Sequence, residues 1–236
     1  MRPSRTRANK QVMKIIPLGD SALVVELADK IGDEALAWVQ ALVRELEKNP
    51  PHGMLEVVPT FTSVAVFYDP AKIGSIDALR NGLVARVPKK APKDKTAARE
   101  VIIPVCYGGE FGPDLAEVAA RTGLDEGAVI KLHSGEKYRV HTVGFAPGFP
   151  YLAGLPEKLH TPRRATPRTR VQPGSVGIGG IQTGVYPLAT PGGWQLIGRT
   201  PLRLFRPENE TEPTLLQPGD YVRFKPVTPE EFVTWK

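Results

Sequence analysis

The sequence has few of the residues that carry covalent or metal chemistry. Its single cysteine, Cys106, cannot form an internal disulfide, which favours a reducing compartment. The four histidines are scattered, and no zinc-type spacing, G-x-S-x-G turn or phosphate-binding P-loop occurs. No apolar run approaches the roughly 18 residues of a membrane-spanning helix. We therefore expect a cytoplasmic protein with no metal and no membrane association, and the sequence leaves the catalytic residues unknown.

Basic residues are concentrated in two segments. Residues 1–10 carry four basic and no acidic residues, and residues 86–100 carry six basic and two acidic residues. The net charge of these two segments together is more positive than the net charge of the whole chain, +6, so the rest of the chain is slightly acidic. Nucleic-acid binding requires a basic face on a folded domain, whereas this excess lies in an expected tail and an expected linker. We expect no nucleic-acid partner.

The first part of the chain, residues 13–87, predicts a small α+β domain. Two short apolar strands precede a helix that begins at Gly32–Asp33 and ends at Asn49–Pro50, because proline cannot continue a helix. Two more strands precede a second helix, which Ser75 caps. The order ββαββα is typical of an open-faced sandwich, with helices on one side of an antiparallel sheet.

The polar segment 88–100 predicts a linker, and residues 101–236 predict a second domain. Two short helices are expected there, one from Gly112–Asp114 to Gly123 and one capped by Asp125. Residues 141–220 contain 12 of the 24 prolines and 12 of the 23 glycines, which excludes long helices. Short strands between them predict a mainly-β sandwich or closed barrel. The expected strands are Tyr138–Val143, Thr169–Val171, Ser175–Ile178, Gly184–Leu188, Trp194–Gly198, Leu202–Phe205 and Tyr221–Phe224.

Three motifs in this domain are long and specific: GFAPGFPYLAGLP at 144–156, PRRATPRTRV at 162–171 and PGGWQLIGRT at 191–200. With them the chain resembles the allophanate hydrolase subunit 1 family, also called the KipI family, from residue 13 to about residue 227. The resemblance implies a small α+β lobe and a cyclophilin-like β-barrel lobe.

The resemblance also implies an activity and its partners. The expected role is that of the B-type subunit of a 5-oxoprolinase, a complex that opens 5-oxo-L-proline to L-glutamate with ATP as co-substrate. The partners would be an A-type subunit and a second allophanate-hydrolase-type component, the C-type subunit, and the chain would be inactive alone. The alternative is a KipI-like protein that grips the dimerisation helices of a sensor histidine kinase and inhibits its autophosphorylation. Prolyl isomerase activity is a weaker third possibility.

Polar residues of the second domain are candidates for binding a small anionic amide. Arg164 and Arg168 belong to a run of four arginines, and Arg199 ends a predicted strand. Planar guanidinium groups suit carboxylates and phosphates, although a basic run also protects a sheet edge from aggregation. His133 stands in the last turn of a short helix, where stabilising the helix dipole is the competing role.

An amide and two aromatic rings complete the candidate set. Gln182 follows the glycine-rich run 177–180, in which glycine allows close approach of a ligand or of a neighbouring strand. Its amide suits a lactam edge, and an ordinary strand-end role is the alternative. Phe149 and Trp194 are flanked by glycine or proline, which places them on loops and makes them candidate pocket walls rather than core residues.

Overall fold

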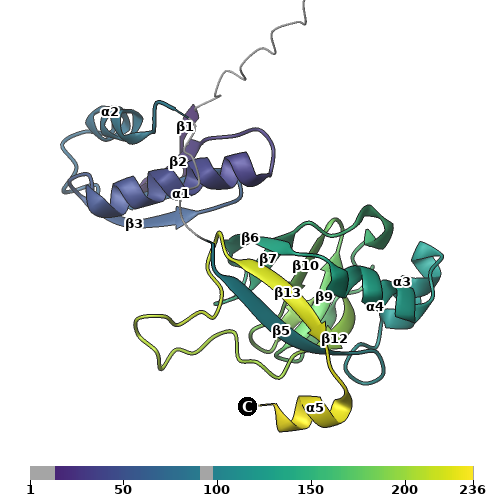
Figure 1. Cartoon of the computed structure of the whole chain (residues 1–236). Coiled ribbons are helices and arrows are strands. Elements are labelled where there is room, and N and C mark those ends of the chain that lie inside the picture. The colour runs from purple at the N-terminus through teal and green to yellow at the C-terminus, as the bar shows by residue number, and fades with distance from the viewer. Residues whose placement is uncertain (1–13, 91–97, 236) are drawn as a thin grey trace, which may run out of the picture. The chain divides into compact units, whose positions relative to one another are not determined.

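The computed structural model describes residues 14–90 and 98–235. The basic tail and most of the expected linker lie outside these ranges. The chain divides into two compact units, Met1–Lys95 and Thr96–Lys236 (Figure 1). No helix in the described ranges is long and apolar enough to cross a membrane.

The first unit is a four-stranded antiparallel sheet with two helices. Its elements follow the predicted ββαββα order, and the sheet order is β1-β2-β4-β3. The side chain of Ser75 caps the second helix by accepting a hydrogen bond from the backbone of Ala78 at 3.0 Å. Leu42 and Leu46 of the first helix are buried in a core shared with the sheet. The elements are β1 (Lys14–Pro17), β2 (Ala22–Glu26), α1 (Asp33–Lys48), β3 (Met54–Pro59), β4 (Ser63–Tyr68) and α2 (Ile76–Arg86).

The second unit is built on a closed barrel, as predicted. Among the described residues, seven strands close it in the order β10-β7-β6-β13-β5-β12-β9, and β11 and β8 form a separate pair. Every neighbouring pair in the barrel is antiparallel except β5 and β13, which are parallel. The strands are β5 (Glu100–Tyr107), β6 (Tyr138–Val143), β7 (Pro150–Ala153), β8 (Arg168–Val171), β9 (Ser175–Gly179), β10 (Gln182–Val185), β11 (Thr190–Gly192), β12 (Gln195–Arg199) and β13 (Tyr221–Pro226).

Helices α3 (Leu115–Thr122) and α4 (Glu126–Gly135) lie against the barrel (Figure 1), where α3 packs on β12 and α4 on β13. Asp125 caps α4 by accepting from the backbone of Ala128 at 2.7 Å, as expected. A 3-10 turn at Glu157–Leu159 and a short helix, α5 (Pro229–Thr234), complete the unit.

Two strand predictions need correction. Leu202–Phe205 is a loop: Leu204 is buried in the core, and Phe205 makes only an isolated bridge to Thr214. The segment predicted as Gly184–Leu188 is β10, which begins two residues earlier and ends at Val185, because Pro187 lacks the amide hydrogen that a ladder requires. The sequence pattern does not predict strands β7 and β11, both of which contain proline.

Candidate functional site

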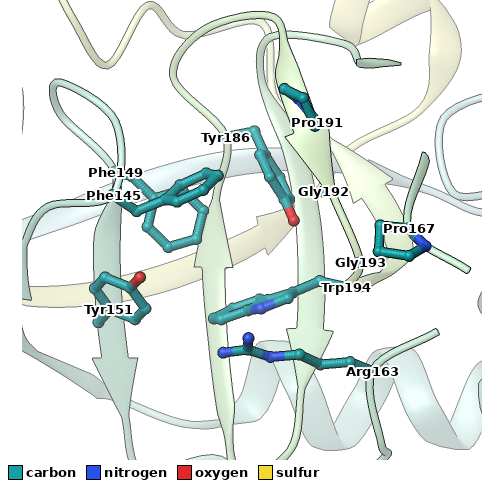
Figure 2. Close-up of a pocket in the computed structure, with 10 residues that line it drawn as sticks. All are labelled: Phe145, Phe149, Tyr151, Arg163, Pro167, Tyr186, Pro191, Gly192, Gly193 and Trp194. Carbon is teal, nitrogen blue, oxygen red and sulfur yellow. The ribbon is translucent and has the colours of Figure 1, made fainter. Parts of the chain in front are cut away.

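A pocket of about 200 Å³ opens among aromatic side chains of the second unit (Figure 2). Most of its walls come from the three sequence motifs: the GFAPGFPY loop with β7, the arginine-rich segment before β8, and the PGGW segment that ends β11 and leads into β12; Tyr186, just after β10, completes them. Phe149 and Trp194 both line it, as predicted, and both are also largely buried. The lining residues are Phe145, Phe149, Tyr151, Arg163, Pro167, Tyr186, Pro191, Gly192, Gly193 and Trp194.

Phe145 lies at the mouth of this pocket in an unusual backbone conformation. Its φ is +69°, and it is the one non-glycine residue in the described ranges with a positive φ. Its ring is 63% exposed and meets the ring of Phe149 edge-on at 5.4 Å. Left-handed backbone is unfavourable for a bulky residue and concentrates at functional sites. An exposed aromatic ring held this way marks the pocket mouth as a candidate binding site.

The floor of the pocket is the indole of Trp194, which lies over the glycine-rich run. A Cβ atom added at Gly179 would stand 2.6 Å from the indole ring, far inside van der Waals contact. The ring of Phe149 meets the indole edge-on at 5.4 Å. Gly179 thus lets a side chain approach the backbone, whereas at Gly177 an added Cβ would also stand 3.3 Å from the carbonyl oxygen of Gln195 on the neighbouring strand β12, as expected.

Tyr186 supplies a hydroxyl to the same pocket. A Cβ atom added at Gly192 would stand 2.5 Å from this hydroxyl, so glycine is required there. Burial raises the pKa of Tyr186, and a hydrogen bond from the backbone N–H of Trp194 to its oxygen opposes this shift. Figure 2 shows the hydroxyl pointing toward Gly192 and Trp194. The hydroxyl donates to no acceptor among the described residues, so its proton is available for a ligand.

Arg163 brings a positive charge to the pocket. Its guanidinium lies 5.9 Å from the centre of the Trp194 ring, a cation–π distance (Figure 2). The structure shows no ion pair between Arg163 and any acid of the described ranges. A pocket with aromatic walls, one hydroxyl donor and one guanidinium without an acidic partner suits a small flat molecule that carries an anionic group.

Arg164 and Arg168, two of the predicted site residues, are held by a buried carboxylate. Asp114 is 4% exposed, and its Oδ1 accepts from Arg164 at 3.1 Å and from Arg168 at 2.7 Å. Its Oδ2 accepts from the backbone N–H of Leu196 at 2.7 Å. Asp114 therefore fixes the arginine-rich segment against β12, and Arg164 acts in this anchor rather than in the pocket.

A second pocket, of about 170 Å³, contains the other predicted arginines. Arg168 and Arg199 both line it, together with Arg170, Glu110 and the buried Ser175. The sequence analysis assigns rings and guanidinium groups to one candidate binding site, and the structure instead divides the predicted rings and arginines between two pockets.

The two remaining predicted residues lie elsewhere. Gln182 begins β10 and lines neither pocket. His133 is fully buried against the barrel, and both ring nitrogens are bonded, to the hydroxyls of Tyr107 at 2.8 Å and Thr183 at 2.9 Å. Burial lowers the pKa of His133 to about 3, so the ring is neutral. It is a core residue and not a helix-dipole or rim residue.

The hydrogen bonds around His133 fix its tautomer. Thr183 donates its hydroxyl proton to the carbonyl of Gly177 at 2.9 Å, so it accepts from Nε2 of His133. Nδ1 then accepts from Tyr107. Each donor in this series of hydrogen bonds has an acceptor, which explains how a polar ring is tolerated in the core.

Sequence reasoning missed four residues that build the site. Arg163 is one of four neighbouring arginines, and nothing in the spacing distinguishes it. Phe145 and Tyr186 are recognisable only as aromatics near glycine and proline. Asp114 has the sequence position of a helix start, although its side chain does not cap that helix.

The family model for the carboxyltransferase domain, subdomain C and D, matches residues 13–216. The chain belongs to this family. Among carboxyltransferase-domain relatives, the 5-oxoprolinase B subunit of Bacillus subtilis is 44% identical over 232 residues, which cover 94% of this chain and 96% of the relative. The protein of the same name from Escherichia coli O157:H7 is 47% identical over 209 residues, 89% of this chain and 94% of the relative.

A solved protein with a similar sequence has the same fold. The crystal structure of TTHA0988 superposes with a TM-score of 0.76 at 39% sequence identity. The match covers 87% of this chain and 40% of that chain, so this chain corresponds to less than half of the solved protein.

Proposed function

We propose that this chain is the B-type subunit of an ATP-dependent 5-oxoprolinase, which hydrolyses the cyclic amide bond of 5-oxo-L-proline to give L-glutamate. The observation that carries the proposal is its identity of 44% and 47%, over nearly the whole of each chain, to proteins named for that role. The A-type and C-type subunits are the expected partners, and ATP is the expected co-substrate of the complex. The named relatives are enzyme subunits and give no support to the kinase-inhibitor alternative.

The aromatic pocket supports this substrate class. 5-Oxoproline is a flat five-membered lactam with one carboxylate. Arg163 would bind the carboxylate, and the indole of Trp194 would stack against the ring. The hydroxyl of Tyr186 would donate to the lactam oxygen as negative charge develops on it.

The sequence contains no complete catalytic set, and this favours an active site completed by partner subunits. In the described ranges, no three histidine, cysteine or acidic side chains come together as a metal site. The role of this chain is then to bind and orient the lactam, which lowers the entropic cost of the reaction.

Reconstitution tests the proposal. The chain is purified with the neighbouring A-type and C-type subunits, and glutamate release from 5-oxoproline is followed with and without ATP. We expect activity only when this chain and ATP are both present. Full activity in its absence would refute the assignment. In the active complex, Arg163→Gln should raise KM for 5-oxoproline, whereas Arg121→Gln on α3, outside both pockets, should leave KM unchanged.

A further inference from the structure

The second pocket has a chemistry of its own. Arg168, Arg170 and Arg199 line it, against the single lining carboxylate of Glu110. Asp114 offsets part of the charge of Arg168, so the pocket remains positive overall. We propose that this pocket is an oxyanion site, which binds a phosphate or carboxylate group.

The arginines of the oxyanion site are held in place but retain free donors. The guanidinium of Arg199 lies 5.0 Å from the centre of the Phe111 ring and 5.2 Å from that of the Phe232 ring, and the two rings contact each other at 4.8 Å. Cation–π contacts hold the charge near the rings without using its N–H groups as hydrogen-bond donors. Neither Arg170 nor Arg199 forms an ion pair with an acid in the part of the chain that the structure describes.

Arg168 adds a positive charge to the site. Its Nη2 donates to Asp114 at 2.7 Å, whereas its Nη1 is buried without a hydrogen-bond partner among the described residues. This nitrogen exposes almost no surface, so Arg168 acts on a bound anion through its charge rather than through this donor. Ser175, which is 3% exposed, adds a hydroxyl to the same lining. These features distinguish the site from a solvated basic edge, whose donors would all be in water.

The site is separate from the aromatic pocket but is built on the same two segments. Pro167 lines the aromatic pocket and Arg168 the oxyanion site, and the same division holds for Trp194 and Leu196. One bound molecule could therefore extend from one pocket into the other across their shared wall. The buried carboxylate of Asp114 holds that wall together by its bonds to Arg168 and Leu196. The oxyanion site itself needs only residues of this chain, so its test does not depend on the proposed function.

The test is phosphate binding by the full chain, followed by calorimetric titration and by the rise in melting temperature at low ionic strength. We expect saturable binding that weakens with added sodium chloride. Arg170→Gln with Arg199→Gln should reduce the affinity about tenfold or more, because hydrogen bonds to charged groups are lost. The matched control is Arg121→Gln with Arg203→Gln, which removes two exposed charges outside both pockets.

Two further variants protect the test against misfolding. Arg170 is exposed, so Arg170→Gln alone leaves the packing of the chain intact and should still weaken phosphate binding. Arg199→Lys keeps the positive charge at the second position. Acetate competition identifies the source of the anion: effective competition indicates a carboxylate, and failure to compete indicates a phosphoryl group. Absence of saturable phosphate binding, or equal affinity in the pocket and control variants, would overturn the proposal.

Discussion

Replacing Asp114 by asparagine should destabilise the second unit far more than the loss of an exposed carboxylate would. The Asp114 carboxylate is almost fully buried and accepts three hydrogen bonds, two of them from arginines whose side chains are 31% and 24% exposed. Asparagine keeps the shape but loses the charge and one acceptor. Breaking a fully buried ion pair costs about 3–5 kcal/mol. Because water reaches both guanidinium groups, we expect about 2–4 kcal/mol for Asp114→Asn.

Calorimetric melting measures this loss. For a unit of this size, about 3–4 °C of melting temperature corresponds to 1 kcal/mol, so the transition of the second unit should fall by about 6–16 °C. The control is Glu117→Gln, an exposed acid on the same helix that pairs with Arg121 at 2.8 Å and more loosely with Arg164 at 3.9 Å; because both contacts are exposed to solvent, it should cost at most about 1 kcal/mol. A shift no larger for Asp114→Asn than for the control would refute the structural role assigned to Asp114.

Three other outcomes follow from the structure. Gly179→Ala should lower the free energy of unfolding in urea by about 1–3 kcal/mol, because the added Cβ would overlap Trp194. Gly135→Ala, where the Cβ would meet open space, should not lower it, and equal effects of the two variants would contradict the packing described for Trp194. The free energy of unfolding should fall as the pH decreases from about 6.5 toward 3, because His133 of the unfolded chain then binds a proton and the buried ring does not. His133→Asn should reduce the slope of this free energy against pH by up to about 1.4 kcal/mol per pH unit, and an unchanged slope would argue against a buried neutral ring. Phe145→Gly should melt higher than Phe145→Ala, because both lose the ring contacts but only glycine adopts the positive φ without strain, and both should raise KM for 5-oxoproline in the complex. A lower melting temperature for Phe145→Gly than for Phe145→Ala would show that no strain is stored there.

Local chemistry accounts for most of what the sequence predicts about the fold. Caps at Ser75 and Asp125 and the proline after Asn49 set helix ends through short-range interactions, and these ends are confirmed. Leu202–Phe205 has the apolar content of a strand, but its backbone pairs only with the loop at 213–215, and sequence alone does not show this. The sequence pattern does not predict strand β7, because its first residue is proline.

The sequence predicts the place of a site residue where that place depends on its neighbours in the chain, and not where it depends on contacts with distant residues. Neighbouring glycine and proline predict that Phe149 and Trp194 line a pocket rather than the core; both line the pocket, but both also belong to a buried aromatic cluster. The partners of Asp114 lie 50, 54 and 82 residues away, so no local pattern reveals its role. His133 sits at the end of a helix as predicted, but α4 packs its ring against Phe224, at 4.6 Å between ring centres, which no helical periodicity indicates.

The parallel pairing of β5 with β13 has a consequence for biosynthesis. The first strand of the barrel, β5, pairs with β12 on one side, and its other neighbour, residues 221–226, is made more than a hundred positions later along the chain. A ribosome-bound fragment that lacks this segment exposes a long unpaired edge, and contacts of such large sequence separation form slowly. Shielding of the nascent β5 edge until release should therefore determine how much of this protein reaches its native state in the cell.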